Sequence, residues 1–308
     1  MSEIHSELRA VRFAPKISFG PLSSRLLRRT KPKGIAPAPG VSVSEIVVPG
    51  PQGAPDVTLR VFSPDQLTAA VPAMLWIHGG GHIIGNPEQD DASNIAFARE
   101  LGIVVAAVRY RLGAVAAAPA SVEDAYAGLK GLVDKADQLH IDPARIAIGG
   151  ASAGGGIAAA LALLAHDRGE IRPAFQLLVY PMLDDRTVVR SDHDTSRVRV
   201  WTAKSNRFGW ATLLGQPPGS SGVSPYAAPA RREDLSGLPP AWIGVGDLDL
   251  FHDEDSEYAR RLTEAGVPCE LHVVAGAFHG FDALYSKTGV AVAFWKEQAR
   301  ALRSALLN

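Results

Sequence analysis

One pentapeptide restricts the fold of this chain more than any other feature: Gly150-Ala151-Ser152-Ala153-Gly154. The short apolar stretch before it, residues 145–149, is typical of a buried parallel strand. The residues after it, 154–166, are rich in alanine and leucine, which favour a helix. Small residues two positions before and after Ser152 let a strand and a helix approach closely at a sharp bend. The sequence therefore predicts a strand–turn–helix unit that raises a nucleophilic serine above a sheet.

A second motif, His78-Gly79-Gly80-Gly81, follows the apolar segment 73–77, which we predict to be another strand. Consecutive glycines leave backbone N–H groups unblocked by side chains, and such donors can stabilise a developing oxyanion. Each motif alone is only moderately specific, because glycine and serine are common residues. Together they predict a serine nucleophile that faces a loop of backbone hydrogen-bond donors.

A serine nucleophile needs a base, and we predict that His279 supplies it. This residue lies in a glycine-flanked loop, residues 276–281, just after the predicted strand 270–274. Loops at the carboxyl edge of a parallel sheet carry the chemistry in such folds. His272 lies inside that strand, where its ring would point sideways from the sheet. His252 is too close in sequence to the candidate carboxylates described next.

The carboxylate that orients the base is expected in the loop after the predicted strand 241–245, where Asp247, Asp249 and Asp253 compete. Asp253 is placed to begin the predicted helix 254–265 as an N-cap or first-turn acid. Of the other two we prefer Asp249, because it falls later in the loop and clear of the strand. Asp247 is the alternative.

These motifs resemble those of the hormone-sensitive-lipase-like esterases, the bacterial family IV carboxylesterases with an α/β-hydrolase fold. The resemblance covers nearly the whole chain from about Val41 onward. It implies that Ser152 is the nucleophile, Asp249 the acid and His279 the base. It also implies that the N–H groups of Gly80, Gly81 and Ala153 form the oxyanion hole. Further matches lie at Tyr110-Arg111-Leu112, Tyr180-Pro181, Leu238-Pro239-Pro240, Asp253-Glu254 and Phe278-His279-Gly280-Phe281.

The chain departs from the family pattern at three places. Ala151 stands where the family usually has Asp or Glu, and His82 follows the three glycines where an aromatic or apolar residue is usual. The Tyr-Arg-Leu motif continues through residues 113–118, Gly113-Ala114-Val115 onward, in place of Ala-Pro-Glu. In family members all three places border the pocket, so the resemblance does not fix substrate preference.

Predicted strands and helices alternate along the chain, which indicates a mostly parallel sheet with helices on both faces. Residues 1–40 and 186–222 do not join this rhythm, and the resemblance implies that they form a small helical cap above the active site. We therefore predict a catalytic α/β-hydrolase domain over residues 41–308, with a cap insertion at about 186–222 and an N-terminal part of the cap in 1–40. The remaining predicted elements are strands at 57–62, 103–109 and 174–180 and helices at 94–101, 122–139 and 290–306.

Composition restricts the partners. The 308 residues are 46% hydrophobic with a formal net charge of -1, which gives no electrostatic attraction for nucleic acid or an anionic membrane. Residues 146–165 carry no charge, but glycines and the turn at Ser152 mark them as the buried centre, so no membrane span is predicted. The opening residues lack the apolar core of a secretory signal. We expect a cytoplasmic protein; its oligomeric state is open, with a homodimer among the alternatives.

The predicted activity is that of a serine carboxylesterase acting on short- to medium-chain acyl esters of small-molecule size through an acyl-enzyme. No metal or organic cofactor is expected. Asp192-His193-Asp194 lacks ligand spacing, because adjacent side chains point in different directions. Amidase, lactonase or deacetylase activity is the alternative within the same chemistry. A non-catalytic ligand receptor on the same fold is the alternative outside it.

Overall fold

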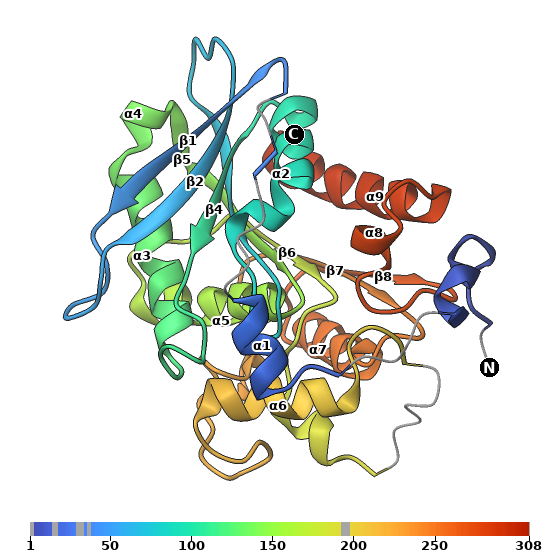
Figure 1. Cartoon of the computed structure of the whole chain (residues 1–308). Coiled ribbons are helices and arrows are strands. Elements are labelled where there is room, and N and C mark those ends of the chain that lie inside the picture. The colour runs from blue at the N-terminus through green and yellow to red at the C-terminus, as the bar shows by residue number, and fades with distance from the viewer. Residues whose placement is uncertain (1–2, 14–17, 29–33, 36–37, 192–197, 308) are drawn as a thin grey trace.

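A computed structural model describes residues 3–13, 18–28, 34–35, 38–191 and 198–307 (Figure 1). Its centre is an eight-stranded sheet in the order β1-β2-β4-β3-β5-β6-β7-β8. The neighbours from β4 to β8 pair in parallel, while β1 with β2 and β2 with β4 pair antiparallel. The predicted mostly parallel sheet is thus confirmed. The strands are β1 (Val41–Val48), β2 (Val57–Pro64), β3 (Val71–Ile77), β4 (Val104–Arg109), β5 (Ile141–Ala151), β6 (Phe175–Val179), β7 (Ala241–Gly246) and β8 (Cys269–Val274).

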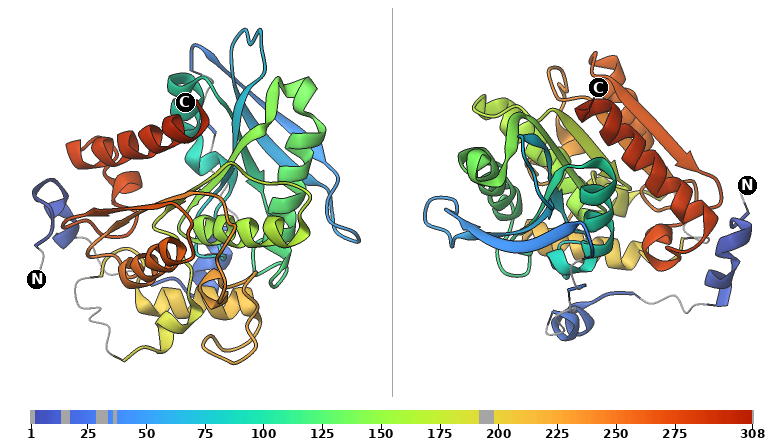
Figure 2. Two further views of the ribbon diagram at one scale, coloured as in Figure 1. Left: turned by 180° about the vertical axis from the view of Figure 1, so that it is seen from behind. Right: turned by 90° about the horizontal axis from the view of Figure 1, so that it is seen from above.

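Helices cover both faces of the sheet, as Figure 2 shows. Successive side chains of a strand point to opposite faces, so each strand contributes to two cores. On β3, Leu75 packs into the core beneath α3 (Ala120–Asp134), α5 (Ala153–Arg168) and α7 (His252–Glu264). Its neighbours Met74 and Trp76 pack into the core beneath α2 (Asp91–Leu101), the short α8 (Phe281–Leu284) and α9 (Gly289–Leu306).

Two features differ from the elements expected from sequence. Strand β1 was not predicted, because only its end residues Val41 and Val48 are buried and its hydrophobic signal is weak. The helix expected over 122–139 is divided at Lys135 into α3 and α4 (Ala136–Leu139). The backbone leaves the α-helical region at this residue, with φ −105° and ψ 17°. Other boundaries shift by a few residues.

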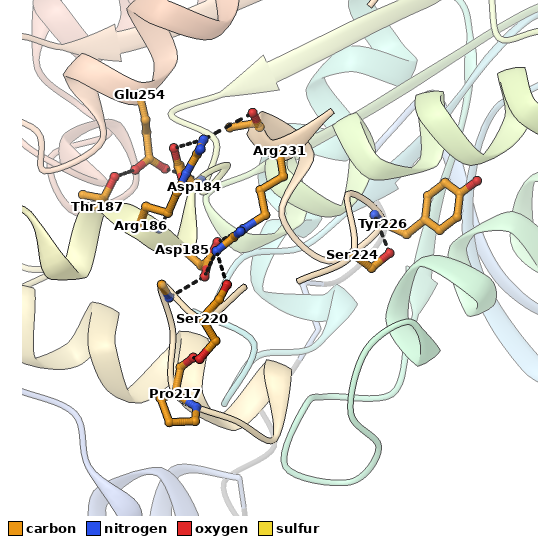
Figure 3. Close-up of polar contacts among 12 residues, drawn as sticks. Asp184, Asp185, Arg186, Thr187, Pro217, Ser220, Ser224, Tyr226, Arg231 and Glu254 are labelled. Carbon is orange, nitrogen blue, oxygen red and sulfur yellow. Dashed lines mark hydrogen bonds and ion pairs between the residues drawn. The ribbon is translucent and has the colours of Figure 1, made fainter. Parts of the chain in front are cut away.

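The segment between β6 and β7 contains η3 (Asp185–Val189), α6 (Ala203–Leu214) and η4 (Pro229–Arg231). A buried ion pair joins its two ends, because Arg231 donates to the fully buried Asp185 at 2.6 and 2.9 Å (Figure 3). The N–H of Gly219 donates to the same carboxylate at 2.6 Å. A bidentate pair with an additional donor is among the stronger polar contacts in proteins, so it holds the two ends of this segment together.

The N-terminal residues pack in two separate places. Helix α1 (Pro21–Leu27) lies beside α6 (Figure 1), where the N–H of Phe19 donates to the hydroxyl of Ser205 at 2.9 Å. The 3-10 helix η1 (Ser6–Phe13) lies instead near the end of β8, with its Leu8 fully buried. There the N–H of His5 donates to the carbonyl of Gly276 at 2.9 Å. Of the part of residues 1–40 that the structure describes, only 18–28 therefore adjoins α6.

Candidate active site

Ser152 occupies the bend between β5 and α5. Its φ of 58° and ψ of −121° are unusual for a residue with a side chain. Its N–H donates to the carbonyl of Val179 at 2.8 Å, and its carbonyl accepts from Met182 at 3.0 Å. A Cβ built on Gly150 would lie 2.5 Å from the carbonyl oxygen of Ile77. The predicted strand–turn–helix unit is thus present, and its tight packing requires a glycine there.

His279 lies in the loop after β8, and its Nε2 is 2.9 Å from the Oγ of Ser152. Both side chains are buried, with 6% and 8% of their surface exposed. The rings of Phe251 and Tyr180 meet the imidazole edge-on, with centroids 5.1 and 4.8 Å away. The imidazole is therefore held against the serine by two aromatic side chains.

Asp249 completes the hydrogen-bonded chain. Its Oδ2 is 2.8 Å from Nδ1 of His279, and its Oδ1 accepts from the N–H of Phe251 at 3.0 Å. Asp247, the alternative from sequence, accepts from the N–H of Gly276 at 2.7 Å instead. Asp253 lies in the first turn of α7. Of the three candidates, Asp249 is the one that contacts the histidine.

The loop after β3 carries the glycines expected to stabilise an oxyanion. A Cβ built on Gly79 would lie 3.4 Å from the Cβ of Ser152, so the loop adjoins the serine. Among the residues that the structure describes, the N–H groups of Gly80, Gly81 and Ala153 donate no hydrogen bond. Ala153 is the first residue of α5, where an N–H has no partner within the helix. The loop that adjoins Ser152 and the start of α5 thus carry three N–H groups without an acceptor in the described part of the chain.

Both histidines of this loop are neutral at neutral pH. Burial lowers the pKa of His78 to about 4 and that of His82 to about 3. The His78 ring stacks on Tyr110, whose hydroxyl donates to the His78 carbonyl at 2.9 Å. The His82 ring lies 5.8 Å from that of Trp210, and in the described part of the chain its nitrogens have no hydrogen-bond partner.

Sequence reasoning missed three residues around His279: Tyr180, Phe251 and Trp201, whose ring centroid is 6.5 Å from the imidazole. Tyr180 had a signal, since the Tyr-Pro pair belongs to the family resemblance. Phe251 and Trp201 had none. Within the described residues, no group of three or more His, Cys, Asp or Glu side chains is arranged to hold a metal ion. The sequence Asp192-His193-Asp194 lies outside the described residues.

An α/β hydrolase is defined by a largely parallel sheet with a serine at a sharp bend between a strand and a helix. Loops of the sheet bring this serine, a histidine and an aspartate into one hydrogen-bonded chain. The chain belongs to the alpha/beta hydrolase fold family, whose model matches residues 74–283. The expected resemblance to the hormone-sensitive-lipase-like esterases is confirmed by this match and by the names of the relatives.

Three of these relatives illustrate the likeness. The esterase LipI of Mycobacterium tuberculosis is 34% identical over 252 residues, which are 79% of this chain and 76% of LipI. The solved structure of a bacterial heroin esterase has a TM-score of 0.89 at 38% identity and covers 99% of this chain and 98% of its own. The solved structure of the esterase LipW of Mycobacterium marinum has a TM-score of 0.84 at 31% identity and covers 99% of this chain and 98% of its own.

Among the described residues, no helix has both the length and the apolar character that a membrane span requires.

Proposed function

We propose that the protein is a serine carboxylesterase that hydrolyses short- to medium-chain acyl esters through Ser152, His279 and Asp249. Its class, a carboxylic ester hydrolase, rests on the family and on relatives named esterases or carboxylesterases. The observation that carries the finer proposal is the continuous chain of contacts, 2.9 Å from Ser152 to His279 and 2.8 Å from His279 to Asp249.

The proposed reaction begins with His279 in the tautomer that donates its Nδ1 proton to Asp249. Its Nε2 then accepts the proton of the Ser152 hydroxyl as the oxygen attacks the ester carbonyl. The N–H groups of Gly80, Gly81 and Ala153 stabilise the oxyanion of the tetrahedral intermediate. His279 next protonates the leaving alcohol, and a water molecule activated by the same base releases the acyl group. None of these steps needs a metal or an organic cofactor.

We infer the preference for short acyl chains from the segments of the protein that surround Ser152. We assign α6 and residues 18–28 to a cap, because Trp201, which precedes α6, lies near His279 and packs on Phe19 at 5.9 Å. A series of aryl esters from acetate to palmitate tests the preference for short chains, and we expect kcat/KM to be highest for the shorter acyl chains.

A cytoplasmic location and a homodimer remain predictions from the sequence.

The nucleophile is tested by Ser152→Ala. We expect this variant to fold and to lose ester hydrolysis, because in the described part of the chain Ser152 supplies the hydroxyl that contacts Nε2 of His279. A serine-directed phosphonate should label the parent protein once and the variant not at all. Residual activity within about tenfold of the parent would place the nucleophile elsewhere.

A further inference from the structure

The oxyanion loop has an unusual backbone. Gly80, Gly81 and His82 have φ values of 123°, 59° and 63°, so three successive residues lie in the region of positive φ. His82 has a side chain, for which this conformation costs on the order of 1 kcal/mol. Such a conformation persists only where surrounding contacts hold it. Contacts with other parts of the molecule must therefore hold this loop.

Helix α6 and Trp201, which lies two residues before the helix begins, clamp Gly81 from two sides. A Cβ built on Gly209 of α6 would lie 2.6 Å from the carbonyl oxygen of Gly81, so the helix backbone is in close contact there. A Cβ built on Gly81 would overlap the indole of Trp201. The indole itself is fixed, because its Nε1 donates to Asn206 of α6 at 3.2 Å and its ring packs on Phe19.

Two of the three departures from the family pattern meet on the same helix. The neutral, buried ring of His82 packs against Trp210 of α6. The carbonyl of His82 accepts from the N–H of Gly113 at 2.9 Å. This hydrogen bond joins the oxyanion loop to residues 113–118, the second departure. A Cβ built on Gly113 would lie 2.8 Å from the Cα of Leu213, also in α6. Both of these departures from the family pattern therefore lie in contact with α6.

We propose that α6, together with Trp201, positions the oxyanion donors by holding Gly81 and the strained His82 in their positive-φ conformation. The inference rests on the proposed acyl-transfer function and assigns a further role within it. An oxyanion exists only in the transition state and the tetrahedral intermediate, so a displaced donor lowers kcat and leaves substrate binding unchanged. Trp201 and Gly209 are then positioning residues, and α6 is more than a wall of the substrate site.

The sharpest perturbation is Gly209→Ala. Alanine favours a helix more than glycine does, so α6 itself is not weakened. The added methyl group pushes against the Gly81 carbonyl, and the shift of Gly81 displaces its N–H from the position of the oxyanion. Losing one oxyanion donor costs about 10²–10³ in kcat, and we expect this partial displacement to cost about 10–100-fold with KM within about threefold.

Inhibitors separate positioning from a general loss of structure. A trifluoromethyl ketone forms a tetrahedral adduct that carries the oxyanion, so its Ki should rise by about the factor by which kcat/KM falls. The planar amide analogue of the substrate should keep its Ki. Lys204→Ala, an exposed position on the same helix, is the matched control and should behave like the parent. Trp201→Ala should lower kcat as Gly209→Ala does, and Trp201→Phe should recover only part of it, because the shorter ring lacks the indole atoms that contact Gly81 and the N–H that donates to Asn206.

A raised KM with the parent kcat would show that α6 acts only in substrate binding and would overturn the inference. Unchanged kcat and unchanged ketone affinity in Gly209→Ala would also overturn it. Should Gly209→Ala fail to fold by circular dichroism, the comparison of Trp201→Ala with Trp201→Phe decides on the same criteria. A parent protein that hydrolyses no ester and takes no phosphonate label would overturn the proposed function and this inference together. The first two results would overturn this inference and leave the proposed function intact.

Discussion

Replacing Asp249 by asparagine should remove most of the activity, for a reason that the contacts of its two oxygens define. Oδ1 accepts from the buried N–H of Phe251, so the amide oxygen of asparagine must take that place. The amide NH₂ then faces Nδ1 of His279, which has to become an acceptor. The ring proton moves to Nε2, which faces Ser152, and the base can no longer accept the serine proton.

The size of the effect follows from two contributions. Turning the amide around restores the correct tautomer but leaves the Phe251 N–H facing an NH₂ group, which costs about 1–3 kcal/mol. Losing the negative charge beside the imidazolium formed during attack costs about 4 kcal/mol at an effective dielectric constant of 20. The sum is about 5–7 kcal/mol, which corresponds to a fall in kcat of about 10⁴–10⁵; the lower value is that of other triad carboxylates.

The assay is steady-state hydrolysis of an aryl acetate, with thermal unfolding as a check on the fold. Asp247→Asn is the matched control: the new side-chain oxygen can still accept from the N–H of Gly276, so kcat should fall less than about tenfold. If Asp249→Asn kept a tenth of the parent kcat while Asp247→Asn lost several orders of magnitude, the triad assignment would be refuted.

Two further predictions concern stability. Burial raises the pKa of Glu254, which accepts from the N–H groups of Leu183 and Asp184, to about 8. A folded-state pKa above the ordinary value means that its contribution to stability is complete below about pH 4.5 and is lost as the pH rises to about 8. Glu254→Gln imitates the protonated carboxyl at every pH. In urea unfolding, the free energy of unfolding of the variant should therefore rise relative to that of the parent by on the order of a few kcal/mol between pH 4.5 and 9. A difference that does not depend on pH would contradict this. Leu8→Ala empties a fully buried position and should lower the free energy of unfolding by about 2–5 kcal/mol, whereas a change below 0.5 kcal/mol, roughly that of a surface substitution, would show that η1 is not part of the core.

The elements that sequence reasoning predicted well are those whose local pattern is set by burial. Parallel strands such as β3 and β4 are covered on both faces and read as unbroken apolar runs, whereas the exposed edge strand β1 gives no such run. The choice between Asp247 and Asp249 depended on which direction each side chain takes within one short loop, and position in the loop only favoured the latter. The clamp of α6 on Gly81 was beyond reach, because Gly209 and Gly81 are far apart in sequence and neither carries a side chain that signals a contact.

The contact between His5 and Gly276 joins the beginning of the chain to the loop that carries His279. Gly276 is bound from both sides, since its carbonyl accepts from His5 and its N–H donates to Asp247. During synthesis η1 leaves the ribosome long before β8, so η1 has no docking site until β8 and the loop after it have been made. This loop is therefore among the last parts of the molecule to be completed.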